Sequence, residues 1–238
     1  MADTSITSVV NTPSDQIVNR IGNNQLTGTN KFGSTTNYTQ FDTTGHQTMV
    51  GTAQPWDDIA VTPTARTTGT QAPTFEKWFD DSAGTSRGVY LYSFDNAIVA
   101  QEKEIFFTIQ FPHSWNGDDI QFHIHWVAES TASTSKVRWG LEYTWKEPSA
   151  VYGDTTIIYA DTDVWGATGT TQNQHTITSF TGLSPTTSED GLSTILIGRV
   201  FRNSSNASDT YTGKVGLLSM DAHFQMARLG SDEEYTAY

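Results

Sequence analysis

Two imidazole side chains stand close together in one apolar segment of the chain. His123 and His125 are two residues apart, so both lie on the same face if this segment is a β-strand. Two histidines of one strand and a third ligand can bind zinc or another transition metal, and the imidazoles of His113 and His223 could converge with them. No carboxylate stands at a fixed spacing beside them, and imidazoles in a sheet also hydrogen-bond to neighbouring strands or to another subunit. The sequence therefore favours structural histidines, and it predicts neither a metal nor another cofactor.

Aspartates stand in pairs at three places: Asp57–Asp58, Asp118–Asp119, and Asp161 with Asp163. Paired carboxylates could serve in acid catalysis or bind calcium. A glycosidase needs two carboxylates that face each other across a cleft at about 5–10 Å, which spacing along the chain does not establish. The Asp118–Asp119 pair follows an Asn-Gly dipeptide, which is typical of a turn. The chain also has no cysteine, no phosphate loop and no dinucleotide-binding fingerprint. We therefore expect that the protein is not an enzyme.

Tryptophans offer a second kind of chemistry, because aromatic faces stack on sugar rings. Trp126, Trp139 and Trp145 fall on the periodic apolar faces of strand-like segments, and we expect them in the core. Trp115 and Trp165 stand in polar loops. They are therefore the candidates for contact with a glycan or a protein partner.

Strand-like alternation surrounds these histidines and tryptophans. Residues 120–126 alternate between an apolar face and a face that carries the two histidines. Eight such segments lie between Gly88 and Arg228, with polar, glycine-rich loops between them: 89–94, 104–111, 120–126, 137–145, 155–159, 174–180, 192–201 and 214–226. In the last segment, the residues expected on one face are Gly216, Leu218, Met220, Ala222, Phe224 and Met226. The pattern predicts an all-β domain over residues 88–238, a jelly roll or β-sandwich of about eight antiparallel strands.

Prolines interrupt the preceding segment, residues 56–87. Pro55, Pro63 and Pro73 disfavour helix and interrupt central strands. We interpret this segment as a transition that holds one strand around Asp58–Thr62, followed by loop.

The N-terminal residues 1–55 have a different composition from the rest. Of the first 50 residues, 29 are Thr, Ser, Asn, Gln or Gly, so the stretch cannot bury enough apolar surface by itself to offset its ordering entropy. We predict an extended attachment arm that gains its contacts from a neighbouring protein. The residues expected to make these contacts are Ile17, Ile21, Leu26, Phe32, Phe41, Trp56 and Asp57.

The charge of the chain excludes some classes of partner. The formal net charge is −13 and the sequence pI is about 4.6, which argues against nucleic acid because phosphate contacts need clustered Lys and Arg. No run approaches the about 20 apolar residues of a membrane helix, and the first residues lack the basic and apolar regions of a signal peptide. We expect no nucleic-acid or membrane partner, and synthesis in a cytoplasm.

Three clusters of residues resemble small virion proteins of tailed bacteriophages. The first is the Pro112-His-Ser-Trp turn followed by His123-Ile-His-Trp, and the second is the upstream Trp56-Asp-Asp. The third is the C-terminal series 198–203, 209–213, 221–225 and 229–234. The resemblance covers roughly Trp56–Glu234.

The resemblance implies a structural role on a virus particle made inside a bacterial host. It implies a capsid decoration (cement) protein on the virion surface, which binds the major capsid protein and associates with itself, with a homotrimer expected. The alternative is a head or tail fibre module that binds host-surface glycans through Trp115 and Trp165. A glycan-degrading enzyme ranks last.

Overall fold

The computed structural model describes residues 29–66, 68–96, 102–132, 135–163, 172–231 and 233–234. The chain divides into two units, Met1–Gln54 and Pro55–Tyr238. Every strand pairing is antiparallel. The helical content of the described residues is the short 3-10 helix η1 (Gly51–Ala53), and within these residues no helix is long and apolar enough to cross a membrane.

The described part of the first unit is a small antiparallel sheet in the order β1-β2-β3. Its strands are β1 (Asn30–Gly33), β2 (Tyr38–Phe41) and β3 (Gln47–Val50). Within residues 29–54, Met49 is the one buried hydrophobic side chain. Of the predicted arm, residues 30–50 thus form a three-stranded meander with almost no core of its own.

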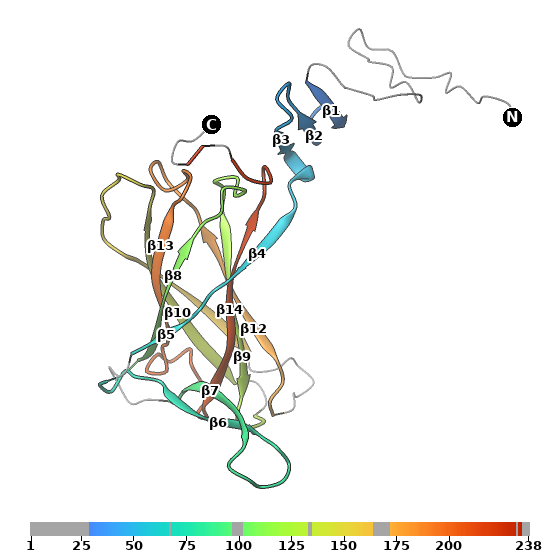
Figure 1. The fold of residues 1–238 in the computed structure, drawn as a ribbon. Coiled ribbons are helices and arrows are strands. Elements are labelled where there is room, and N and C mark those ends of the chain that lie inside the picture. Colours follow the sequence, from blue (N-terminus) through green and yellow to red (C-terminus); the bar gives the residue numbers. More distant parts are fainter. Residues whose placement is uncertain are drawn as a thin grey trace, which may run out of the picture. The chain divides into compact units, whose positions relative to one another are not determined.

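The second unit contains two sheets that face each other (Figure 1). The five-stranded sheet has the order β11-β10-β13-β8-β5. Its strands are β5 (Thr64–Ala65), β8 (Lys103–Gln110), β10 (Lys136–Lys146), β11 (Thr156–Asp163) and β13 (Ile195–Arg202).

The opposite sheet has six strands, and β14 (Val215–Gln225) holds it together. Along one edge β14 pairs with β9 (Ile120–Ala128), which pairs in turn with β12 (Thr176–Leu183). Two strands share the other edge of β14: β7 (Gly88–Phe94) pairs with its first residues, and β4 (Trp56–Ala60) pairs with its last. The remaining strand is β6 (Thr74–Asp80), which pairs with β7.

The inner faces of the two sheets enclose one hydrophobic core. Trp126 of β9 and Trp139 of β10 are completely buried, and their ring centroids lie 6.3 Å apart. Trp145 is also buried, so the core position predicted for these three tryptophans is confirmed. The eight strands predicted between Gly88 and Arg228 are β7–β14, which confirms the all-β sandwich.

Residues 56–87 differ from the expectation of one strand followed by loop. They contain β4, β5 and β6, all paired with strands of the sandwich. Pro55, Pro63 and Pro73 each stand one residue before one of these strands. A proline in that position removes no strand donor, so it marks the start of a strand and does not prevent it.

For the last segment, residues 214–226, the prediction of which side chains share one face is wrong in the first half of the strand. A register shift in the pairing of β14 with β9 falls between Leu217 and Ser219. Leu217 is therefore buried, whereas Leu218 is 37% exposed on the outer face. A bulge adds one residue to one strand and so reverses the side on which every earlier side chain lies.

Candidate functional site

The outer face of the six-stranded sheet brings together four of the six histidines of the chain. His123 and His125 come from β9, His223 comes from β14, and His175 precedes β12. In the register of the sheet, Asp221 of β14 lies directly opposite His123. Side chains two residues apart on one strand share a face, so Asp221 also reaches His125 diagonally.

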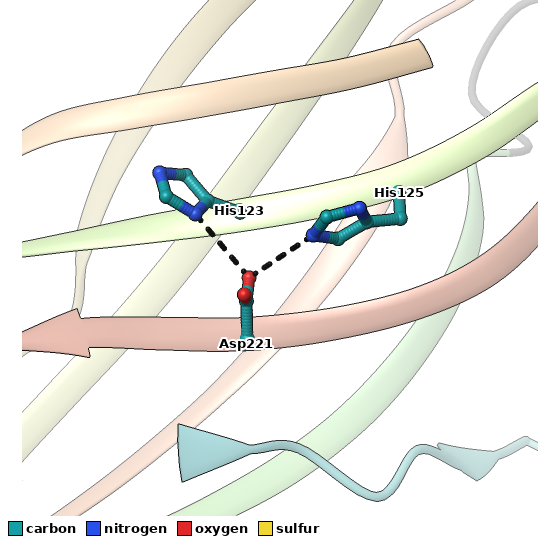
Figure 2. Close-up of side chains that lie close together, drawn as sticks. All are labelled: His123, His125 and Asp221. Atoms are coloured by element: carbon teal, nitrogen blue, oxygen red, sulfur yellow. Dashed lines mark ion pairs between the residues drawn. The ribbon is translucent and has the colours of Figure 1, made fainter. Parts of the chain in front are cut away.

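Asp221 is the centre of this cluster (Figure 2). Its Oδ1 lies 3.4 Å from His123 Nδ1 and 3.4 Å from His125 Nε2. The three side chains are each 18% or 19% exposed. Their donor atoms lie within 4.8 Å of one another, an arrangement that can hold a metal ion. Two imidazoles and one carboxylate form a ligand set suited to a transition metal.

Hydrogen bonds and ring contacts fix the surroundings of the cluster. The Nδ1 of His125 lies 2.8 Å from Nε2 of His175, within hydrogen-bonding distance. His223 pairs through its Nδ1 with the carboxylate of Asp58 on β4. Trp56 stacks on the His223 ring, with centroids 4.7 Å apart and planes 5° from parallel.

A shallow depression of about 370 Å³ opens beside the cluster. Its lining residues are Asp58, Ala60, His125, His175, Leu218, Ser219 and Asp221. The outward position of Leu218, which the bulge in β14 creates, thus forms one wall of the depression. A ligand of a metal held by Asp221 would have access from this side.

Part of this site was predicted from the sequence. His123, His125 and His223 are brought together, whereas His113 is separate: its two ring nitrogens contact Ser231 Oγ at 2.8 Å and Ser193 Oγ at 3.0 Å. Asp221 was missed, although it stands two residues before His223 and therefore shares its face. His175 was missed because a lone histidine before a strand carries no signal of its position.

Trp115 does not have the exposed position expected of a glycan contact. It is 4% exposed, and its ring lies 4.4 Å from that of Phe111 and 6.1 Å from that of Trp145. Its Nε1–H donates to the backbone oxygen of Asp118 at 3.1 Å. The loop folds back so that the indole enters the core, which corrects the prediction for Trp115. Trp165 lies outside the described residues.

The predicted attachment residues fall into three groups. Phe32 and Phe41 are 56% and 38% exposed, and their rings meet edge to face at 6.2 Å. Trp56 and Asp57 are exposed on β4. The remaining three, Ile17, Ile21 and Leu26, lie outside the described residues.

Three of the paired aspartates that were considered for acid catalysis accept hydrogen bonds from nearby residues. Asp57 accepts from the backbone N–H of Asp58 at 2.9 Å, and Asp118 accepts from the side chain of Asn116 at 2.7 Å. Both carboxylate oxygens of Asp161 accept from Arg138 at 2.7 Å. Each of these three carboxylates therefore has a structural role, in a turn or along a strand.

One serine has the spacing of a nucleophile elbow, Gly-x-Ser-x-Gly, within residues 84–88. An elbow places its serine on a sharp turn from a strand to a helix. Here Ser86 lies in the loop between β6 and β7, which pair as an antiparallel hairpin, and Gly88 is the first residue of β7. The setting of Ser86 is thus a hairpin loop and differs from that of an elbow.

Comparisons with known proteins do not assign the chain to a family. No protein-family model matches it, and no curated protein does either. It is similar to the solved structure of TmCBM61 in complex with β-1,4-galactotriose, at 8% identity and a TM-score of 0.28, over 72% of this chain and 88% of that chain. It is also similar to the CBM22-1-GH10 modules of Clostridium thermocellum xylanase 10B complexed with xylohexaose, at 10% identity and a TM-score of 0.27, over 77% of this chain and 27% of that chain. Likenesses at this level identify neither a ligand nor a family for this chain.

Proposed function

We propose that the protein is a non-catalytic structural component of a tailed-bacteriophage virion, a decoration protein that binds the major capsid protein and stabilises the shell. In this proposal the β-sandwich is the exposed body, and the N-terminal unit attaches it to the capsid. Self-association, with a homotrimer expected, multiplies the attachment points of one assembly.

The observation that carries the proposal is the meander β1–β3. A small sheet needs a hydrophobic face packed against something else to be stable in water. This one buries a single apolar side chain, Met49, and exposes the phenylalanine pair Phe32 and Phe41. Phe32 pairs with Thr39 in the register, so Phe41 is its diagonal neighbour on the same face. The two rings form an apolar contact surface ready for a partner protein.

The expected energetic effect follows from burial. Each phenylalanine that becomes fully buried in a contact contributes about 1.5–3 kcal/mol before ordering costs. A protein that binds assembled subunits and not dissociated ones stabilises the assembly by linkage. Decorated shells should therefore resist heat better than undecorated ones.

The fibre alternative loses one of its two supports. It relied on Trp115 and Trp165 as exposed aromatic contacts for a host glycan, and Trp115 is buried against Phe111 and Trp145. We therefore keep decoration of the capsid as the proposal and treat host binding as an outcome of the test.

The first experiment is to label the C-terminal Tyr238 and image virions. Label spread over the icosahedral head is the expected result. Label confined to the tail would overturn the decoration proposal and support the fibre alternative.

The second experiment tests the meander directly. The double variant Phe32→Ser/Phe41→Ser should lose binding to undecorated heads, as measured by co-sedimentation. The matched control is Phe75→Ser, which removes a phenylalanine that is 61% exposed on the sandwich. Equal binding by the double variant and the control would show that the phenylalanine pair is not the attachment surface.

A further inference from the structure

We propose that His123, His125 and Asp221 form a binding site for one divalent transition-metal ion of the zinc type. The site lies on the outer face of the six-stranded sheet. It is independent of the attachment role of the N-terminal unit, and it can be tested on the isolated protein.

The sheet itself sets the geometry of the three ligands. His123 and Asp221 are a direct cross-strand pair of β9 and β14, and His125 pairs with Ser219 two residues away. Both strands lie in the interior of the sheet, with β12 beyond β9 and β4 beyond the end of β14 that carries Asp221. The ligand-bearing backbone is therefore held on both sides, as a preorganised site requires.

The distances fit a metal better than they fit hydrogen bonds. At 3.4 Å, the contacts of Asp221 Oδ1 with the two imidazole nitrogens are longer than the usual 2.7–3.2 Å of an N–H···O hydrogen bond. Two ligand atoms that are each about 2.0–2.1 Å from a tetrahedral zinc ion are about 3.4 Å apart. The pairs His123–Asp221 and His125–Asp221 thus already have the separation of two edges of a zinc coordination tetrahedron.

The carboxylate oxygen at the centre has no hydrogen-bond donor. Asp221 Oδ1 is shielded from solvent and accepts no hydrogen bond from the residues that the structure describes; its contacts with the two imidazoles are ion pairs at 3.4 Å, which need a protonated histidine. A buried carboxylate oxygen without a hydrogen bond loses free energy relative to its hydrated state. A cation bound to the three ligands compensates this loss directly.

The surroundings of His125 match those of a metal-binding histidine. Its Nε2 faces Asp221, while its Nδ1 lies 2.8 Å from His175 Nε2. If Nδ1 carries the proton and donates it to His175, Nε2 presents its lone pair to the metal. A second group that orients the ligating imidazole in this way is usual in zinc sites, and removing it typically costs 10–100-fold in affinity.

The ligand types define the class of ion. Two imidazole nitrogens with one carboxylate suit zinc, cobalt, nickel or copper, whereas calcium and magnesium prefer sets made only of oxygen. Three protein ligands leave a coordination position open. The depression lined by His175, Leu218 and Ser219 gives water or a small anion access to that position.

The test uses the whole chain after chelator treatment and dialysis, with Zn²⁺ in isothermal titration calorimetry and Co²⁺ in absorption spectroscopy. One Zn²⁺ should bind per chain, and Co²⁺ should give the visible absorption of a low-symmetry site. Asp221→Asn and His125→Gln should each weaken Zn²⁺ binding by at least 100-fold. His175→Gln should weaken it by about 10–100-fold and keep the stoichiometry of one.

The matched control is His113→Gln, which removes a histidine outside the cluster and should bind Zn²⁺ like the unmodified chain. Circular dichroism of each variant shows whether the sandwich is folded. Zn²⁺ should also raise the Tm of the unmodified chain and of His113→Gln, but not that of Asp221→Asn. Absence of Zn²⁺ binding by the folded unmodified chain, or an equal loss in His113→Gln and His125→Gln, would overturn the proposal.

Discussion

Arg202 and Asp209 form an ion pair in which neither side chain is exposed to solvent. The guanidinium donates from Nε to Asp209 Oδ2 at 2.9 Å and from Nη2 to Oδ1 at 2.8 Å. Its other N–H groups donate to the backbone oxygens of Phe94, Tyr211 and Gly213. All five donors of Arg202 therefore have acceptors, and the pair ties the end of β13 to β7 and to the loop before β14.

Removing the charge of Asp209 should strongly destabilise the sandwich. Asp209→Asn leaves the buried Arg202 without its counter-charge, so we expect the free energy of unfolding to fall by about 3–5 kcal/mol. Asp161→Asn is the matched control, because Asp161 pairs with Arg138 but is 34% exposed. There we expect a loss of about 1 kcal/mol or less. Urea unfolding of both variants checks this, and equal losses would contradict it.

Phe201 should make residue 140 intolerant of any side chain. A Cβ at Gly140 would overlap Cζ of Phe201, whose ring is held edge-on by Tyr159 and covered by Arg199. We expect Gly140→Ala to cost about 1–3 kcal/mol in unfolding free energy, because an overpacked site must shift. Gly153→Ala, where a Cβ meets nothing within 4 Å, should change it by about 0.5 kcal/mol or less.

A double-mutant cycle isolates the contact between residues 140 and 201. The cost of Gly140→Ala should be smaller in a Phe201→Ala background than in the unmodified chain. If Gly140→Ala lowers the unfolding free energy equally in both backgrounds, the clash is not with the Phe201 ring.

The indole N–H of Trp126 depends on one hydroxyl. It donates to Oγ1 of Thr178 at 2.9 Å inside the core. Thr178→Val keeps the shape of the side chain but leaves this donor unpaired, so a loss of about 1–3 kcal/mol is expected. Thr181→Val, at an exposed position of the same strand, should have almost no effect. Thermal unfolding followed by tryptophan fluorescence distinguishes the two results.

Glu142 should make stability fall in acid. The hydrogen bond from Thr155 and the neighbouring Arg199 lower the pKa of Glu142 below its ordinary 4.5. A lowered folded-state pKa contributes stability above the unfolded pKa, and this contribution is lost as the pH falls through the folded pKa. Urea unfolding between pH 7 and pH 3 should therefore show a smaller acid-induced loss in Glu142→Gln than in the unmodified chain.

Glu102 provides a control of opposite sign. Burial raises the pKa of its carboxyl, so the folded chain takes up that proton at a higher pH than the unfolded chain. This uptake favours the folded state as the pH falls. In Glu102→Gln the acid-induced loss of stability should be larger, and the same change in both variants would contradict the assigned pKa directions.

The alternation of apolar and polar residues within single segments was sufficient to predict the strands and the core. The alternation of residues 120–126 put Ile120, Phe122, Ile124 and Trp126 on one face, and all four are completely buried. It also placed His123 and His125 together on the other face. Both results depend only on the period of two along a strand, which a single segment carries by itself.

The rest of the site depends on pairing between distant segments. Asp221 meets His123 only because β14 pairs with β9 in one register, and no property of either segment alone fixes that register. The bulge at Leu218 changes the outward face of β14 within one strand. Trp115 stands in a polar segment and yet is buried, because the turn folds back over the end of the core.

The position of β14 between β9 on one edge and β7 and β4 on the other has a consequence for synthesis of the protein. Strand β9 ends at Ala128, and its partner β14 ends at Gln225, so one edge of β9 stays unpaired while the ribosome adds the 97 residues between these two positions (225 − 128). At about 5–20 residues per second, this takes about 5–20 s, during which β4, β7 and β9 present free edges to other nascent chains. A product that stops before Val215 lacks the strand that all three require, so translation arrest there should give aggregates and no partly folded sandwich.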